Sequence, residues 1–196
     1  MLSSCKSKPL APDEMRDAAG NRYKTVTVGS QVWMAENLKA LYINCVNNSS
    51  VINSIDADFR YPDNNPAKHA IYGLLYTLDG ASELVPSKGK WRIPTLFDFE
   101  KLLNELGVDY ENGSSAVRNA LNIDIFPGSN ESDIISIDKY FSLLLYEYSS
   151  DLYLDYQTVL LFARDYPVND YYSRTIYNEN ISKGYACSVR FVRDIE

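Results

Sequence analysis

The chain of 196 residues has few of the side chains on which many enzymes and nucleic-acid-binding proteins depend. It contains 1 histidine and 3 cysteines, and they form no His/Cys cluster in the sequence that suggests a zinc site. With 19 Lys and Arg against 26 Asp and Glu, its net charge of −7 argues against the basic surface that nucleic acid requires. No apolar run approaches the roughly 18 to 20 residues of a membrane-spanning helix. We therefore expect neither a nucleic-acid partner nor a membrane-spanning segment.

Catalytic motifs are equally scarce. His69, the single histidine, lies in PAKHAIYG between an expected loop and an expected strand, where a surface or strand-edge position is favoured over a Ser-His-Asp site. No glycine-rich phosphate-binding motif is present, and no pair among the many carboxylates is singled out for glycoside hydrolysis. The sequence therefore predicts no catalytic residue and a protein that is not an enzyme.

Calcium binding is undecided on the sequence alone. Residues 61–65, YPDNN, and residues 168–170, VND, supply oxygen ligands of a suitable type, but both stretches are also typical of plain turns. We predict no cofactor, with calcium as the open alternative and with no metal ligands assigned.

Two parts of the chain have the patterns of β-strands. Apolar residues alternate over residues 21–34, NRYKTVTVGSQVWM, on both sides of Gly29-Ser30, which predicts a two-residue hairpin. From residue 138 onward, turn residues separate aromatic and β-branched runs, which predicts antiparallel strands, the last over residues 186–195.

Two helices are expected between these parts. Thr95 is followed by Asp98 at the capping-box position, and Gly107 is a stop signal, so a helix is predicted over residues 95–106. A second helix is predicted over residues 114–121. The order of hairpin, helices and strands predicts an α+β domain.

Four segments together resemble one known family. In chain order they are GNRYKTVTVGSQVWMAENL (20–38), YGLLYT (72–77), KWRIPTLFDFEKLLNELG (90–107) and GYACSVRFVRD (184–194). They resemble the Fibrobacter succinogenes major paralogous domain, which is found in secreted and surface proteins of Gram-negative bacteria. The resemblance spans nearly all the chain after residue 20.

The segment WRIPT (91–95) also resembles the formylglycine-generating proteins, and this wider similarity implies a C-type-lectin-like fold. In such a fold the N-terminal hairpin and the C-terminal strand share one antiparallel sheet, beside two helices and a long irregular loop region. The chain departs from the family pattern, because it lacks a cysteine before Trp91 and has Phe191 where members often have another.

Residues 1–12 are expected to be a lipoprotein leader and tether, and residues 13–196 a single domain of this family. Leu2-Ser3-Ser4-Cys5 fits the bacterial lipobox, in which the cysteine is lipidated. A lipid on Cys5 predicts an outer-membrane or cell-surface protein held by that lipid only, with the periplasmic face left open. The alternative is an ordinary thiol in a flexible leader.

The other two cysteines, Cys45 and Cys187, form an even pair. In an oxidising compartment they are able to form a disulfide, while two separate buried thiols are the equal alternative.

A binding surface is predicted from the composition of residues 165–185, where Tyr, Asn, Ser and Asp dominate, as they do in antibody paratopes. The alternative is that the tyrosines pack on a sheet and the polar residues form turns. The candidates are Tyr166, Asn169, Asp170, Tyr171, Tyr172, Tyr177, Asn178 and Asn180.

Together these features predict a non-enzymatic lipoprotein of the cell envelope that binds a glycan or a protein, for instance in adhesion. A structural subunit of a surface assembly is the alternative, and a carbohydrate-active enzyme is the less favoured third.

Overall fold

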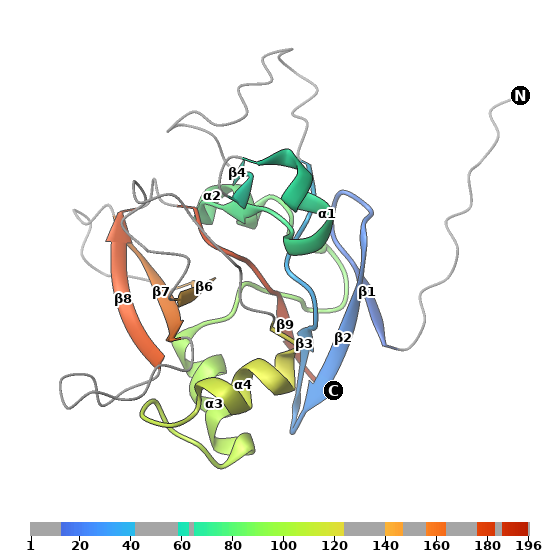
Figure 1. Cartoon of the computed structure of the whole chain (residues 1–196). Helices are drawn as coiled ribbons and strands as arrows, with labels where there is room; N and C mark the ends of the chain where they lie inside the picture. Colours follow the sequence, from blue (N-terminus) through green and yellow to red (C-terminus); the bar gives the residue numbers. More distant parts are fainter. Residues whose placement is uncertain are drawn as a thin grey trace, which may run out of the picture.

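The computed structural model of the chain describes residues 13–41, 59–62, 65–123, 140–146, 156–163, 176–182 and 186–195 (Figure 1). These residues form a mixed α+β architecture, which confirms the predicted fold class. Within them, no helix has the length and apolar character needed to cross a bilayer. The narrower assignment to a C-type-lectin-like fold stays a prediction.

The N-terminal hairpin and the C-terminal strand share one antiparallel sheet, as predicted. Its strands, in spatial order, are β1 (Glu14–Arg16), β2 (Arg22–Val28), β3 (Gln31–Met34) and β9 (Val192–Asp194). Val28 pairs with Gln31 across the Gly29-Ser30 turn, and Gly29 has a φ of 54°. A positive φ at the first central position is typical of a type II′ hairpin turn, which glycine adopts without strain. The predicted hairpin is therefore confirmed.

The two predicted helices are present as α3 (Leu96–Leu106) and α4 (Ser114–Leu121). The Thr95 hydroxyl accepts the Asp98 N–H at 3.2 Å, and the Asp98 carboxylate accepts the Thr95 N–H at 3.0 Å, which completes the capping box. Figure 1 shows both helices together at the lower end of the molecule. Buried side chains of the two helices form one hydrophobic cluster with Trp33 and Val192. The helix residues in this cluster are Phe99, Leu102, Leu103, Val117 and Leu121.

The sequence patterns miss several short elements. They are β1, β4 (Phe59–Arg60), the 3-10 helix η2 (Pro66–Lys68), α1 (His69–Tyr72), β5 (Leu75–Tyr76) and α2 (Leu78–Ser82). His69 thus begins a helix instead of preceding a strand, and two α-helices are present beyond those expected. Elements of two to five residues are too short to show a helical or a strand period.

β4 and β5 pair in a two-stranded antiparallel sheet. A three-stranded antiparallel sheet contains β6 (Tyr140–Leu144), β7 (Tyr156–Ala163) and β8 (Ile176–Ser182) in that order. These strands confirm the prediction for this part of the chain. Figure 1 shows β7 and β8 on the opposite side of the molecule from β1 and β2.

The last predicted strand, residues 186–195, is wrong in its length, because only Val192–Asp194 is a strand. Residues 187–192 are all buried, and they change partner along the way. Cys187 forms a single bridge with Tyr76 and Ser188 forms one with Leu143, before β9 pairs with β3. The segment therefore connects the separate sheets instead of continuing one of them.

Candidate functional site

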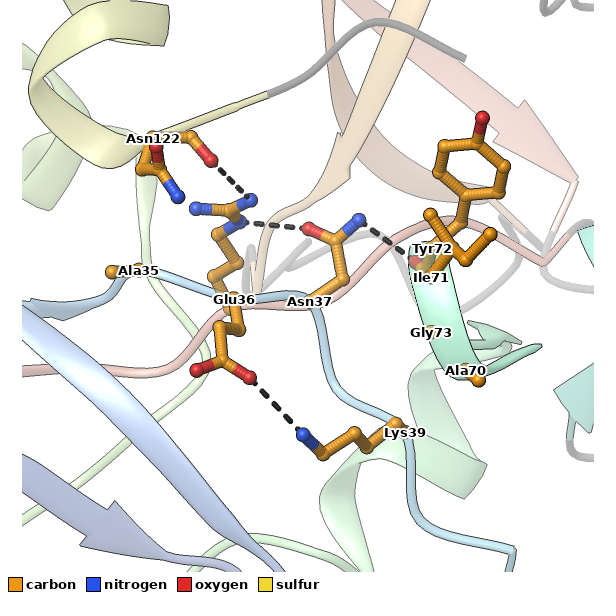
Figure 2. A pocket seen from close by; sticks show the side chains of 10 residues that line it. Ala35, Glu36, Asn37, Lys39, Ala70, Ile71, Tyr72, Gly73 and Asn122 are labelled. Atoms are coloured by element: carbon orange, nitrogen blue, oxygen red, sulfur yellow. Dashed lines mark hydrogen bonds and ion pairs between the residues drawn. The ribbon is translucent and has the colours of Figure 1, made fainter. Parts of the chain in front are cut away.

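The described part of the chain contains a small pocket between the segment after β3 and the end of α1 (Figure 2). Its volume is ≈ 120 Å³. Residues 35–37 and Lys39 form one side, residues 70–73 form the other, and Asn122 and Arg190 complete the lining. The pocket therefore joins stretches that lie far apart in the sequence.

The wall that contains Leu38 is paired on both of its edges. The Leu38 N–H donates to the Val189 carbonyl at 2.9 Å, and the Leu38 carbonyl accepts the Leu74 N–H at 2.9 Å. Gly73 permits this close approach, because it has a φ of 78° and a Cβ there would lie 2.5 Å from the Leu38 carbonyl oxygen. A glycine is therefore required where the two sides of the pocket meet.

Two buried tyrosines hold the next residues of the same wall. The Tyr23 hydroxyl accepts the Lys39 N–H at 3.0 Å and donates to Asp17 at 2.7 Å. The Tyr76 hydroxyl donates to the Ala40 carbonyl at 2.7 Å. Burial raises the pKa of both hydroxyls well above the ordinary value, so they stay protonated and continue to donate at neutral pH. These hydrogen bonds therefore fix the conformation of the wall.

Arg190 lines the pocket and is 3% exposed. Its Nε donates to the Asn37 side-chain oxygen at 2.7 Å, and its other nitrogens donate to the carbonyls of Leu121 and Asn122 at the end of α4. Asn37 in turn donates to the Tyr72 carbonyl at 3.0 Å (Figure 2). One guanidinium therefore caps the C-terminal end of α4 and orients the pocket amide.

Glu36 and Lys39 place opposite charges at the edge of the pocket, with the carboxylate and the ammonium 3.0 Å apart (Figure 2). Burial raises the pKa of Glu36, but the Lys24 N–H at 3.1 Å and the Lys39 ammonium lower it by more, so the net pKa lies below the ordinary value. The Lys39 ammonium also lies 5.1 Å from the centroid of the Tyr23 ring. The pocket thus has a fixed acceptor beside a fixed donor.

The pocket contains few of the groups that catalysis or metal binding uses, among the residues that the structure describes. Glu36 is the one carboxylate among the described residues that line it, whereas glycoside hydrolysis requires two. The described ranges contain no group of three or more His, Cys, Asp or Glu that could hold a metal ion. A ring nitrogen of His69 lies 2.8 Å from the Lys39 carbonyl, so this histidine supports the pocket wall.

A second polar cluster, at the start of α3, connects three elements. Asp98 is 2% exposed and accepts from Arg92 at 3.1 Å and from Gln31 of β3 at 3.2 Å. The hydrogen bond to Asp98 raises the pKa of Arg92. Arg92 also contacts Asp194 of β9 at 2.9 Å, and Lys101 of α3 pairs with the same carboxylate at 3.0 Å. These groups bind one another, so we assign the cluster a structural role.

The predicted binding residues are not tested by this geometry. Tyr166, Asn169, Asp170, Tyr171 and Tyr172 lie outside the described residues. Tyr177, Asn178 and Asn180 belong to β8, and their side chains also lie outside the described part. The binding surface over residues 165–185 therefore stays a prediction.

The predictions for Cys5 and for a Cys45–Cys187 disulfide are also untested by the structure. Cys5 and Cys45 lie outside the described residues, so lipidation and the disulfide both stay predictions. Cys187 is buried in the hydrophobic cluster that includes Leu38, Tyr76 and Leu144.

Sequence reasoning missed the pocket, although a signal for it was present. Three of the segments that carry the family resemblance, residues 20–38, 72–77 and 184–194, each contribute lining residues. Their convergence was not readable from the sequence, because hydrogen bonds across the whole length of the chain bring them together.

Comparison with known proteins identifies one family. The family model of the Fibrobacter succinogenes major domain (Fib_succ_major) matches residues 26–136. No curated protein and no solved structure matches the chain with significance.

Proposed function

Because the chain belongs to the Fibrobacter succinogenes major domain family, we propose that it is a non-enzymatic binding module of the bacterial cell envelope. It recognises a glycan or a protein, and a lipid on Cys5 holds it at the outer membrane or cell surface. The anchor rests on the lipobox-like Leu2-Ser3-Ser4-Cys5. The binding role rests on the pocket beside Glu36 and Lys39.

The size of the pocket is the observation that carries this proposal. A site for a whole small molecule or cofactor usually has a volume of about 300 to 1,000 Å³. The pocket of ≈ 120 Å³ is well below that range. It suits one protruding group of a larger ligand, as in the recognition of a polymer at a surface.

The arrangement of the pocket supports binding without catalysis. Its donors and acceptors are already held by Tyr23, Tyr76 and Arg190, which reduces the conformational entropy that a ligand must overcome. Its single described carboxylate, Glu36, is ion-paired with Lys39 and has a lowered pKa, whereas a general acid requires a raised pKa.

Thermal unfolding of the purified chain against a panel of glycans, with calcium and with chelator, tests the proposal. A ligand that binds the native state raises the Tm. We expect a reproducible rise with one class of glycan. No rise at saturating concentrations would contradict glycan binding and leave protein partners, which a pull-down with envelope extracts then examines.

Two sets of variants identify the surface that binds. Lys39→Met changes the pocket, and Tyr171→Ala with Tyr172→Ala changes the surface predicted from composition. Loss of the Tm rise in the first set alone would place binding at the pocket. Loss in the second set alone would place it in residues 165–185.

A further inference from the structure

The pocket offers two complementary hydrogen-bonding groups at a fixed spacing. The Glu36 carboxylate accepts from Lys24 N–H and Lys39, and a carboxylate has about four acceptor positions in total. The Lys39 ammonium carries three donors, of which one is directed to Glu36. Both groups therefore keep capacity for a ligand, on the same side of the pocket.

The charges of this pair favour a neutral ligand. Glu36 and Lys39 lie 3.0 Å apart, so each charge partly offsets the other. Arg190, the third charged residue of the lining, is 3% exposed, and its nitrogens donate to the Asn37 side chain and to the carbonyls of Leu121 and Asn122. An anionic ligand would be attracted by Lys39 but repelled by Glu36. A cationic ligand would be attracted by Glu36 but repelled by Lys39. A group with one N–H and one C=O satisfies both residues at once.

Two apolar side chains lie on the opposite side of the pocket. Ala70 and Ile71 line it, and Ile71 is 75% exposed although it is a large aliphatic side chain. A methyl group placed against them would remove apolar surface from water, at roughly 25 cal/mol per Å². The pocket therefore has a donor and an acceptor along one edge and two apolar side chains on the other side.

We infer that the pocket binds the acetamido group of an N-acetylated amino sugar within a glycan. The N–H of that group donates to Glu36, its carbonyl accepts from Lys39, and its methyl packs against Ala70 and Ile71. This inference rests on the proposed function and specifies its ligand. The polar side chain of Asn122 at the pocket is available for the sugar hydroxyls that surround the acetamido group.

The volume agrees with this assignment. The pocket, at ≈ 120 Å³, is small for a whole ligand, and an acetamido group has only four non-hydrogen atoms. A backbone amide within a peptide continues on both sides, whereas an acetamido group ends in a methyl and enters as a terminal group.

A titration with matched oligosaccharides tests the inference. Triacetylated chitotriose and cellotriose are both neutral and β1-4-linked, and they differ in the acetamido groups. By isothermal titration calorimetry we expect the acetylated sugar to bind with a Kd on the order of millimolar, and cellotriose to bind roughly tenfold more weakly. In ¹H–¹⁵N spectra, the amides of Lys39 and Gly73 should shift with the acetylated sugar.

Variants locate the effect. Lys39→Met keeps the aliphatic stem but removes the donor, and Glu36→Gln keeps the shape but removes the charge; each should weaken binding of the acetylated sugar by roughly tenfold. Ala70→Leu should block the pocket without changing a buried residue. Lys101→Met, which changes a lysine in the cluster at the start of α3, is the matched control and should bind as the wild type does. The Tm of each variant checks that it is folded.

The outcomes separate this inference from the proposed function. Equal binding of cellotriose would overturn the acetamido assignment while leaving a glycan-binding module. An Nε-acetyl-lysine peptide that binds as tightly as the acetylated sugar would overturn the sugar assignment. Absence of binding by every glycan of the panel would remove the proposed glycan function as well.

Discussion

At the scale of single residues, Asp98 is the acceptor on which the start of α3 depends. Its carboxylate accepts from the Thr95 N–H and hydroxyl, both at 3.0 Å, as well as from Arg92 and Gln31. Since the side chain is buried, no water replaces a lost partner there. Trp33 extends the cluster by donating to Gln31 at 3.2 Å.

Asp98→Asn should lower the free energy of unfolding by about 2 kcal/mol. The substitution removes the charge that these donors bind, and it places an NH₂ group where a carboxylate oxygen accepted hydrogen bonds. The free energy of unfolding in urea measures this loss. Asp194→Asn is the control, since Asp194 is 51% exposed on its side chain and belongs to a surface ion pair, so the loss should stay below about 1 kcal/mol. Equal losses in the two variants would contradict the assignment of Asp98 as the central acceptor.

Asp194 should also make a small pH-dependent contribution to stability. Its hydrogen bond from Lys101, followed by the charge of Arg92, lowers its pKa below the ordinary value of 3.8. The stabilisation is therefore fully present above pH 3.8, the unfolded-state value, and is lost as the pH falls through the lower folded-state pKa. The difference in unfolding free energy between wild type and Asp194→Asn should be constant near neutral pH and shrink below that value. A difference that grows on acidification would contradict this sign.

At the scale of elements, the helix whose signals are local in sequence was predictable, whereas the pocket, which depends on long-range contacts, was not. The helix α3 was predictable because Thr95, Asp98 and Gly107 lie within it or at its ends and act on their own neighbours. The pocket was not, because its wall exists only when Leu38 pairs with Leu74 and Val189. The short helix α1 has no apolar period, since it consists of only His69–Tyr72.

Two glycines with similar φ should respond differently to alanine. Gly107 has a φ of 66° and no atom within 4 Å of an added Cβ, so Gly107→Ala should cost about 1 kcal/mol from backbone strain alone. Gly73 has a φ of 78°, and its added Cβ would lie 2.5 Å from the Leu38 carbonyl oxygen. Gly73→Ala should therefore lower the free energy of unfolding by at least about 2 kcal/mol. It should also weaken binding at the pocket. Urea unfolding of both variants checks this order, and equal effects would show that the pocket walls separate freely.

At the scale of the whole molecule, the buried segment 187–192 connects elements that are otherwise separate. It bridges to Tyr76, to Leu143 of β6, and to Arg92 before α3, and it continues into β9 beside β3 (Figure 1). Its Arg190 reaches the end of α4. The domain therefore closes only when the C-terminal segment is in place, although its sheet begins with the N-terminal hairpin.

Deletion of residues 187–196 should abolish cooperative folding. Val189, Phe191 and Val192 are fully buried, and at about 1.5–3 kcal/mol each their loss approaches the total stability of about 5–15 kcal/mol of a typical domain. Circular dichroism during heating should show no cooperative transition. Deletion of residues 1–12 is the matched control and should leave the Tm unchanged, because β1 begins at Glu14 and Asp13 already pairs with Thr25. A cooperative transition after the C-terminal deletion would mean that the sheets and the helices fold without the segment that joins them. A lowered Tm after the N-terminal deletion would place the start of the domain before residue 13.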